Sequence, residues 1–131
     1  MAGNVFVFNS LIAQNSDLGN FNRPDCSGTL TSVTYSLIQN TTGCTLPGSA
    51  TGVITGKAAQ IGPLMDHGGA TWTHALLPNS PALNTGRPFA SGIVLNNCLS
   101  TDQRGVGRPM GPRCDIGAFE AVLVYLPVVM R

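Results

Sequence analysis

The sequence predicts an all-β protein built as a solenoid, and three observations lead to this class. Sixteen glycines and nine prolines interrupt the 131 residues so often that few places remain for a helix of ordinary length. Short β-branched or aromatic runs, which favour strands, lie between these breaks. One run, Ser10-Leu11-Ile12, recurs further along the chain as Ser36-Leu37-Ile38. A unit that recurs within about 20 to 50 residues is typical of stacked coils.

Residues 1–60 are expected to hold these coils. The run from Asn4 to Phe8 predicts a strand that is apolar on both faces. Leu and Ile of the repeat would fill the interior, while Asn at the corners would adopt the left-handed backbone of a tight bend. Residues 20–28 are rich in turn formers and predict a loop inserted between the two copies. Val53-Ile54 is a further strand candidate.

The remaining residues, 61–131, are expected to form a C-terminal cap, because a solenoid needs an atypical terminal unit. Residues 61–86 contain no repeat and many Pro and Gly stops, so we expect an irregular wrap there. The segment from Asp102 to Glu120 and a last strand within Val122–Met130 would complete the cap. The residues expected to pack against the coils are Trp72, Leu76, Leu77 and Leu83.

The four cysteines favour two local disulfides in an oxidising compartment. They form no Cys-x-x-Cys pair, which counts against a zinc or redox motif. Spacing favours Cys26 with Cys44 and Cys98 with Cys114, although four cysteines allow three connectivities. Because the opening residues lack the basic stretch of a signal peptide, we expect the chain to be a fragment of a longer exported protein.

Charge and hydropathy exclude two classes of partner. Only 10% of the residues are charged and the formal net charge is +1, so the chain has no electrostatic surface for nucleic acid. The apolar tail contains Pro127 and is shorter than the about 20 residues that span a bilayer, which argues against a transmembrane segment. The sequence also predicts no cofactor.

A series of motifs resembles a known family. These motifs are Asp25–Ser32, Tyr35–Ile38, Thr42–Cys44, Ile61–Leu64, Asp66–Gly69, Thr73–Ala82, Thr101–Gly105, Arg108-Pro109 and Cys114–Glu120. Together they look like the C-terminal region of secreted bacterial right-handed parallel β-helix proteins of the choice-of-anchor Q type. The resemblance covers residues 4 to 120 and implies a right-handed parallel β-helix, an extracellular or cell-surface location and no particular activity. Relatives often have Asn at the position of Ser36 and Pro at that of Gly107.

The Asp102–Glu120 segment, here called the closing segment, allows two interpretations. Its carboxylates could supply the pair that a glycoside hydrolase needs, about 5 to 9.5 Å apart. Equal numbers of carboxylates and arginines instead favour mutual pairing and a structural clasp without catalytic residues. The clasp residues would be Asp102, Arg104, Arg108, Arg113, Asp115 and Glu120.

A second group of candidates could bind a ligand. His67 and His74 flank Trp72, and Asp66 is adjacent, but no further histidine exists to complete a set of metal ligands. A histidine beside Gly-Gly is more often a turn residue, so no metal site is predicted. Exposed aromatic rings could stack on sugars, and the candidates for such stacking are Phe21, Tyr35 and Trp72.

The sequence therefore predicts a non-catalytic structural or adhesive protein of the cell surface. The alternative is a β-helix protein that binds or degrades polysaccharide, as pectate lyases do. The expected partners are a polysaccharide or another copy of the chain, which would pair with the open strand edge near Val5.

Overall fold

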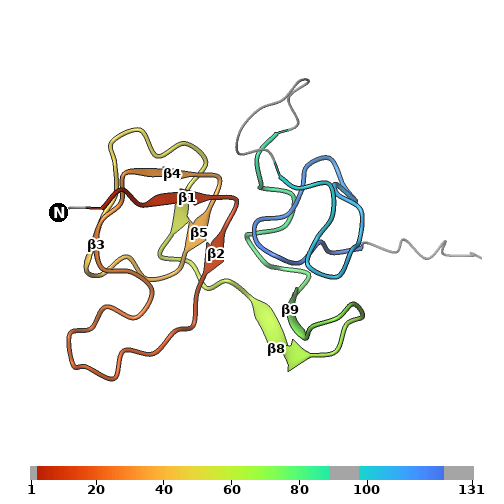
Figure 1. Cartoon of the computed structure of the whole chain (residues 1–131), viewed down its shortest axis with the longest axis horizontal. Helices are drawn as coiled ribbons and strands as arrows, with labels where there is room; N and C mark the ends of the chain where they lie inside the picture. Colours follow the sequence, from red (N-terminus) through yellow and green to blue (C-terminus); the bar gives the residue numbers. More distant parts are fainter. Residues whose placement is uncertain (1–2, 89–97, 123–131) are drawn as a thin grey trace, which may run out of the picture.

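The computed structural model describes residues 3–88 and 98–122, which contain β-strands and no helix. The prediction of an all-β protein is confirmed for this part of the chain. The expected last strand within Val122–Met130 lies, apart from Val122, outside the described residues. The strands, shown in Figure 1, are β1 (Phe6–Phe8), β2 (Leu11–Ile12), β3 (Gly28–Thr29), β4 (Ser32–Thr34), β5 (Leu37–Ile38), β6 (Cys44–Thr45), β7 (Ile54–Thr55), β8 (Ile61–Met65) and β9 (Thr73–Leu76).

The first seven strands form three small parallel sheets, with the orders β1-β4, β2-β5-β7 and β3-β6. The two copies of the sequence repeat pair directly, because Leu11 lies opposite Leu37 and Ile12 opposite Ile38. Their neighbours also match, since the backbone N–H of Ser10 donates to Oγ of Ser36 over 3.1 Å. The repeat therefore marks two strands of one sheet.

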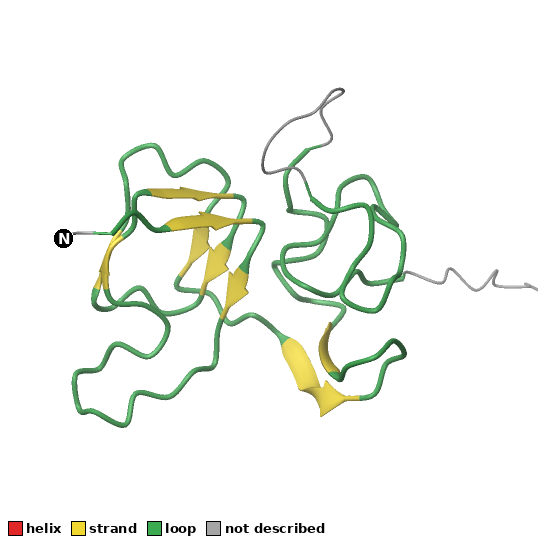
Figure 2. Ribbon diagram, viewed as in Figure 1, coloured by secondary structure: helices red, strands yellow, loops and turns green. Residues whose placement is uncertain are grey.

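The expected right-handed parallel β-helix is wrong. The parallel sheets are separate and their strands are very short, with loops making up most of the chain (Figure 2). The pairing offset also changes, because the step along the chain from Phe6 to its partner Ser32 is much longer than that from Gly28 to its partner Cys44. After β7 the pairing becomes antiparallel, between β8 and β9. The described strands therefore form small separate sheets and do not build a solenoid.

Both faces of β5, the central strand of the β2-β5-β7 sheet, are buried, and this explains its apolar residues. Adjacent residues of a strand point to opposite faces. Leu37 and Ile38 of β5 are both 0% exposed and belong to different apolar clusters. Ile38 packs with Val33 and Leu30 inside the first part of the chain. Leu37 faces the second part of the chain, which begins at residue 61.

The two parts of the chain share the cluster around Leu37. Its buried members come from both parts, namely Leu37, Ala59, Leu76, Ala82 and Ile116. A backbone bond reinforces this contact, because Gly117 N–H donates to the Asn9 carbonyl over 3.0 Å. Asn9 has a φ of 45°, the left-handed conformation expected for an Asn at a bend.

Two disulfides join neighbouring segments. Cys26 is bonded to Cys44, with their Cα atoms 5.6 Å apart, and Cys98 to Cys114, with Cα atoms 6.5 Å apart. This is the connectivity that the sequence spacing favours. Two disulfides are compatible with a secreted protein.

Residues 61–76 differ from the irregular wrap expected there. They form an antiparallel hairpin of β8 and β9, in which Ile61 lies opposite Leu76 and Met65 opposite Thr73. The expected packing of Trp72 and Leu77 is wrong, because both side chains are exposed. Leu76 is buried, and Leu83 packs against the same cluster. Trp72 is adjacent to Thr73, and adjacent residues of an extended segment point to opposite sides, so the burial of Thr73 leaves Trp72 exposed.

Candidate ligand-binding groove

The closing segment is organised around the buried carboxylate of Asp102. This carboxylate accepts hydrogen bonds from the backbone N–H groups of Arg104 (2.8 Å), Val106 (3.0 Å) and Glu120 (2.9 Å). The Arg104 guanidinium donates to it from Nε over 3.0 Å and from Nη2 over 2.7 Å. Burial raises the pKa of Asp102, but the hydrogen bonds from Glu120, Arg104 and Val106 together hold it below its ordinary value of 3.8.

Glu120 joins the two ends of the same segment. Its Oε1 accepts from Met110 N–H over 2.9 Å, and its Oε2 accepts from Asp115 N–H over 3.0 Å. Arg108 Nε lies 3.6 Å from Oε2 and makes no hydrogen bond, although its Nη2 donates to the Gly117 carbonyl over 2.7 Å. Glu120 is thus held mainly by backbone donors and secondarily by charge.

Asp115 and Arg113 do not pair with each other. Asp115 accepts from the backbone N–H groups of Asn84 and Ala121, over 2.7 Å in each case. Arg113 donates from Nε to the Gly86 carbonyl over 2.8 Å and lies 5.6 Å from the centre of the Tyr35 ring. The prediction that carboxylates and arginines pair throughout the segment therefore holds for Asp102 and Arg104 and for Glu120 and Arg108, but not for these two.

These contacts leave the carboxylates of the closing segment without a free face for a substrate. Asp102, Asp115 and Glu120 are 7%, 2% and 1% exposed, and every carboxylate oxygen accepts at least one hydrogen bond. A glycosidase carboxylate must instead reach the scissile bond or a water beside it. The geometry supports a structural clasp.

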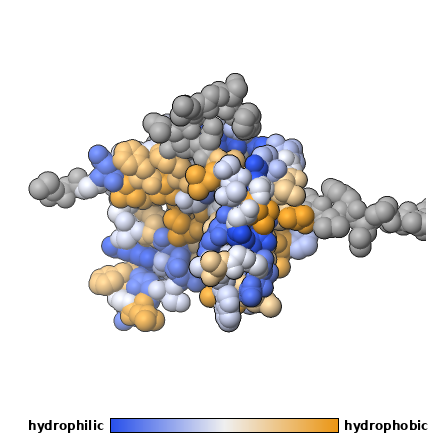
Figure 3. All heavy atoms as spheres, turned by 45° about the vertical axis from the view of Figure 1, so that its right-hand side comes forward, coloured by the Kyte–Doolittle hydropathy of each residue, from blue (hydrophilic) through white to orange (hydrophobic). Residues whose placement is uncertain are grey.

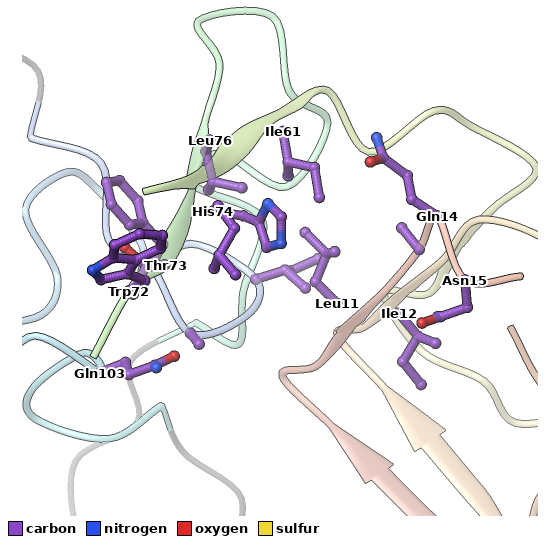
Figure 4. A pocket seen from close by; sticks show the side chains of 15 residues that line it. Leu11, Ile12, Gln14, Asn15, Ile61, Trp72, Thr73, His74, Leu76 and Gln103 are labelled. Atoms are coloured by element: carbon purple, nitrogen blue, oxygen red, sulfur yellow. The ribbon is translucent and has the colours of Figure 1, made fainter. Parts of the chain in front are cut away.

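A concave site lies elsewhere, between β2 and the β8-β9 hairpin. It is a groove with a volume of about 660 Å³. Figure 4 shows Trp72, Thr73 and His74 along one side and Ile12, Gln14 and Asn15 along the other. Its apolar floor continues the shared core and consists of Leu11, Ile61, Leu76 and Ile116.

Trp72 presents an exposed aromatic ring in this groove, with an exposed fraction of 63%. The residues on either side of it are anchored. Thr71 Oγ1 accepts from Gln103 Nε2 over 2.7 Å, and Thr73 is buried, with its Oγ1 3.0 Å from Nδ1 of His67. The indole is therefore carried by a fixed backbone while its ring is open to solvent. Such a ring can stack on a flat apolar ligand face at low entropic cost.

The polar side chains of the groove are three amides, one imidazole and the hydroxyl of Thr73. Gln14, Asn15 and Gln103 each supply an amide, which donates and accepts hydrogen bonds. His74 Nδ1 lies 2.8 Å from the Gly62 carbonyl, so this nitrogen is the donor and Nε2 of a neutral ring is an acceptor. Neither Asp, Glu, Lys nor Arg lines the groove in the part of the chain that the structure describes. The site therefore suits an uncharged ligand that carries both donors and acceptors.

The three residues predicted to bind a ligand separate into two groups. Trp72 and His74 line the groove, whereas His67 packs behind its wall. The His67 ring meets Phe119 edge to face, with centroids 5.5 Å apart, and Arg104 stacks on the same phenyl ring with Cζ 3.7 Å from its centroid. Within residues 3–88 and 98–122, no three His, Cys, Asp or Glu side chains are placed to hold a metal ion.

Sequence reasoning missed the amides of the groove. Asn15 closes the first copy of the repeat, where the sequence predicts a corner, and Gln14 precedes it. Gln103 lies among the charged residues of the closing segment. Gln14 does adopt a left-handed φ of 59°. Their shared role depends on three segments that meet only in the folded chain, so no local signal indicates it.

Comparisons with known proteins do not identify the chain. No family model, no curated protein and no solved structure matches it. The resemblance to choice-of-anchor Q proteins stays a prediction. Across the described residues, the structure contains no helix of the length and apolarity needed to cross a membrane.

Proposed function

We propose that the protein is a non-catalytic, adhesive glycan-binding protein that acts outside the cell, with the groove between β2 and the β8-β9 hairpin as its binding site. The observation that carries the proposal is the exposed Trp72 ring on an anchored backbone, opposite the amides of Gln14 and Asn15. A pyranose ring has an apolar C–H face, which stacks on an aromatic ring, and hydroxyl edges, which hydrogen-bond to amides.

The lining of the groove narrows the ligand to neutral sugars. A polyuronide would require cationic partners for its carboxylates. The described lining residues supply none, although the chain has seven basic residues in total. We therefore expect neutral hexose or pentose polymers to bind better than pectin.

Binding to a glycan array, followed by titration calorimetry, tests the proposal. Truncating a central interface Trp typically costs about 2 kcal/mol or more, so Trp72→Ala should weaken binding roughly thirtyfold. The melting temperature should change little, because the indole is exposed. Phe6→Ala is the matched control: Phe6 is a ring on β1 that is 56% exposed and does not line the groove, so this variant should bind as the parent does.

The alternative, a polysaccharide-degrading enzyme, predicts a different result in an activity assay. Release of reducing ends from pectin or another polyuronide, abolished in Asp115→Asn at unchanged fold, would contradict the non-catalytic proposal. The burial of Asp115 and its hydrogen bonds to Asn84 and Ala121 argue against that result. An array without any binding that depends on Trp72 would also overturn the proposal.

A further inference from the structure

The loop between β2 and β3, residues 13–27, exposes two large apolar side chains. Leu18 is 95% exposed and Phe21 is 71% exposed. In the space-filling view, apolar atoms protrude at the lower left of the molecule, where Figure 1 places this loop (Figure 3). Large apolar side chains that an ordered loop holds in solvent suggest a contact surface.

Hydrogen bonds fix the conformation of this loop from within. Asp17 accepts from the N–H of Gly19 through Oδ1 and from the N–H of Arg23 through Oδ2, over 2.8 Å in each case. The N–H groups of Arg23 and then Gly19 hold the pKa of Asp17 below its ordinary value. The Arg23 guanidinium lies 5.8 Å from the centre of the Phe21 ring. The turn that carries the Phe21 ring therefore has a backbone fixed by these hydrogen bonds.

The base of the loop is tied to the rest of the molecule. Asp25 accepts from the Asn15 side chain over 2.9 Å and from the Asn40 N–H over 2.8 Å. The next residue, Cys26, is bonded to Cys44 on β6. Because its ends and its turn are fixed, the loop can present Phe21 to a ligand without a large ordering cost.

The loop also adjoins the groove. Beside Phe21 lies a second hollow, with a volume of about 580 Å³, and its other lining residues are Ser16, Asp17, Leu18, Arg23 and Ser27. Gln14 and Asn15 line the groove, and the next residues along the chain, Ser16 and Asp17, line this hollow. Consecutive Cα atoms are about 3.8 Å apart, so adjacent residues of one short segment line the two concave sites.

We propose that the Phe21 hollow is a second subsite for the same glycan, so that the ligand is an extended polysaccharide chain that runs from Trp72 across residues 14–17 to Phe21. This inference rests on the proposed function. Each end of the site has an aromatic ring, and the hydroxyls of Ser16 and Ser27 resemble the amides of the groove in offering both donors and acceptors. A single terminal sugar would use the groove alone.

Titration calorimetry with oligosaccharides of two to eight units from cellulose, mannan and xylan tests this. For the oligosaccharides that bind, affinity should rise with length. Phe21→Ala should leave the affinity for the shortest ligands unchanged and lower that for the longest at least fivefold. Trp72→Ala should weaken binding at every length, and Phe6→Ala should have no effect.

The two proposals fail differently. If Trp72→Ala weakens binding while Phe21→Ala has no effect at any length, or if affinity does not rise with length, the second subsite is wrong and the groove stands. If none of the three series binds in a manner that depends on Trp72, the groove itself is wrong. A melting temperature for Phe21→Ala equal to that of the parent shows that its binding loss is not a folding defect.

Discussion

Single residues of the closing segment show how buried acids can stabilise a loop-rich chain. Asp102 and Glu120 accept backbone hydrogen bonds from within the segment, and Asp115 accepts them from outside it. A loop without a strand ladder must satisfy its buried N–H groups by other means, and ionised carboxylates are strong acceptors. The acidic residues of this segment therefore serve as acceptors for buried backbone N–H groups as much as they pair with arginines.

Asp102→Asn should destabilise the fold by about 3 kcal/mol or more, because it breaks a buried ion pair and turns one acceptor oxygen into a donor amide. Urea denaturation with unchanged disulfides measures the loss. Asp66→Asn is the control, since exposed Asp66 uses Oδ1 to accept from Gly68 N–H and Asn retains such an oxygen. Its cost should stay below about 0.5 kcal/mol. Equal effects of the two substitutions would contradict the structural role of Asp102.

At the scale of elements, the tip of the β8-β9 hairpin is held by its contact with the closing segment. Gly68 and Gly69 in this tip both have left-handed backbones, with φ of 92° and 79°. They differ in their surroundings, because a Cβ at Gly69 would lie 2.8 Å from Arg104 Cα, while a Cβ at Gly68 would meet nothing within 4 Å. Substituting each glycine in turn therefore distinguishes the cost of backbone strain, which both positions share, from the cost of a steric clash, which only Gly69 has.

Gly68→Ala should cost about 1 to 2 kcal/mol, the penalty of a left-handed Ala. Gly69→Ala should cost more, because the backbone of Arg104 must also move. It should also weaken glycan binding, since the hairpin tip positions Trp72. Chemical denaturation gives the two stabilities and calorimetry the affinities. If both variants lose equal stability, the hairpin tip does not depend on packing against the closing segment.

At the scale of the whole molecule, the acids make stability depend on pH. The folded pKa of Asp102 lies below its ordinary value of 3.8. An acid of this kind contributes its full stabilisation above the unfolded pKa and loses it as pH falls through the folded pKa. The pKa of Asp17, on the loop beside the groove, shifts in the same direction. Acid should therefore destabilise the fold.

Titration of Asp102 and Asp17 should leave the free energy of unfolding nearly constant from pH 7 to 5. At pH values below about 4, the free energy of unfolding should decrease. Urea midpoints measured between pH 2.5 and pH 7 test this. The Asp102→Asn protein, which lacks the titrating group, should start from a lower stability and show a shallower decline. Parallel declines in the two proteins would mean that Asp102 does not carry the dependence.

The all-β class, the two disulfides and the matching of the two Ser-Leu-Ile copies could be predicted from the sequence. These follow from local composition and spacing, because Gly and Pro stop helices and matching apolar residues pair across a sheet. Only the tertiary structure shows that the strands form small separate sheets, followed by an antiparallel hairpin, in place of a solenoid. It also decided that Trp72, Gln14 and Gln103 share one groove. Such placements depend on contacts between distant segments, and the direction of each side chain there follows from a strand register that local spacing does not encode.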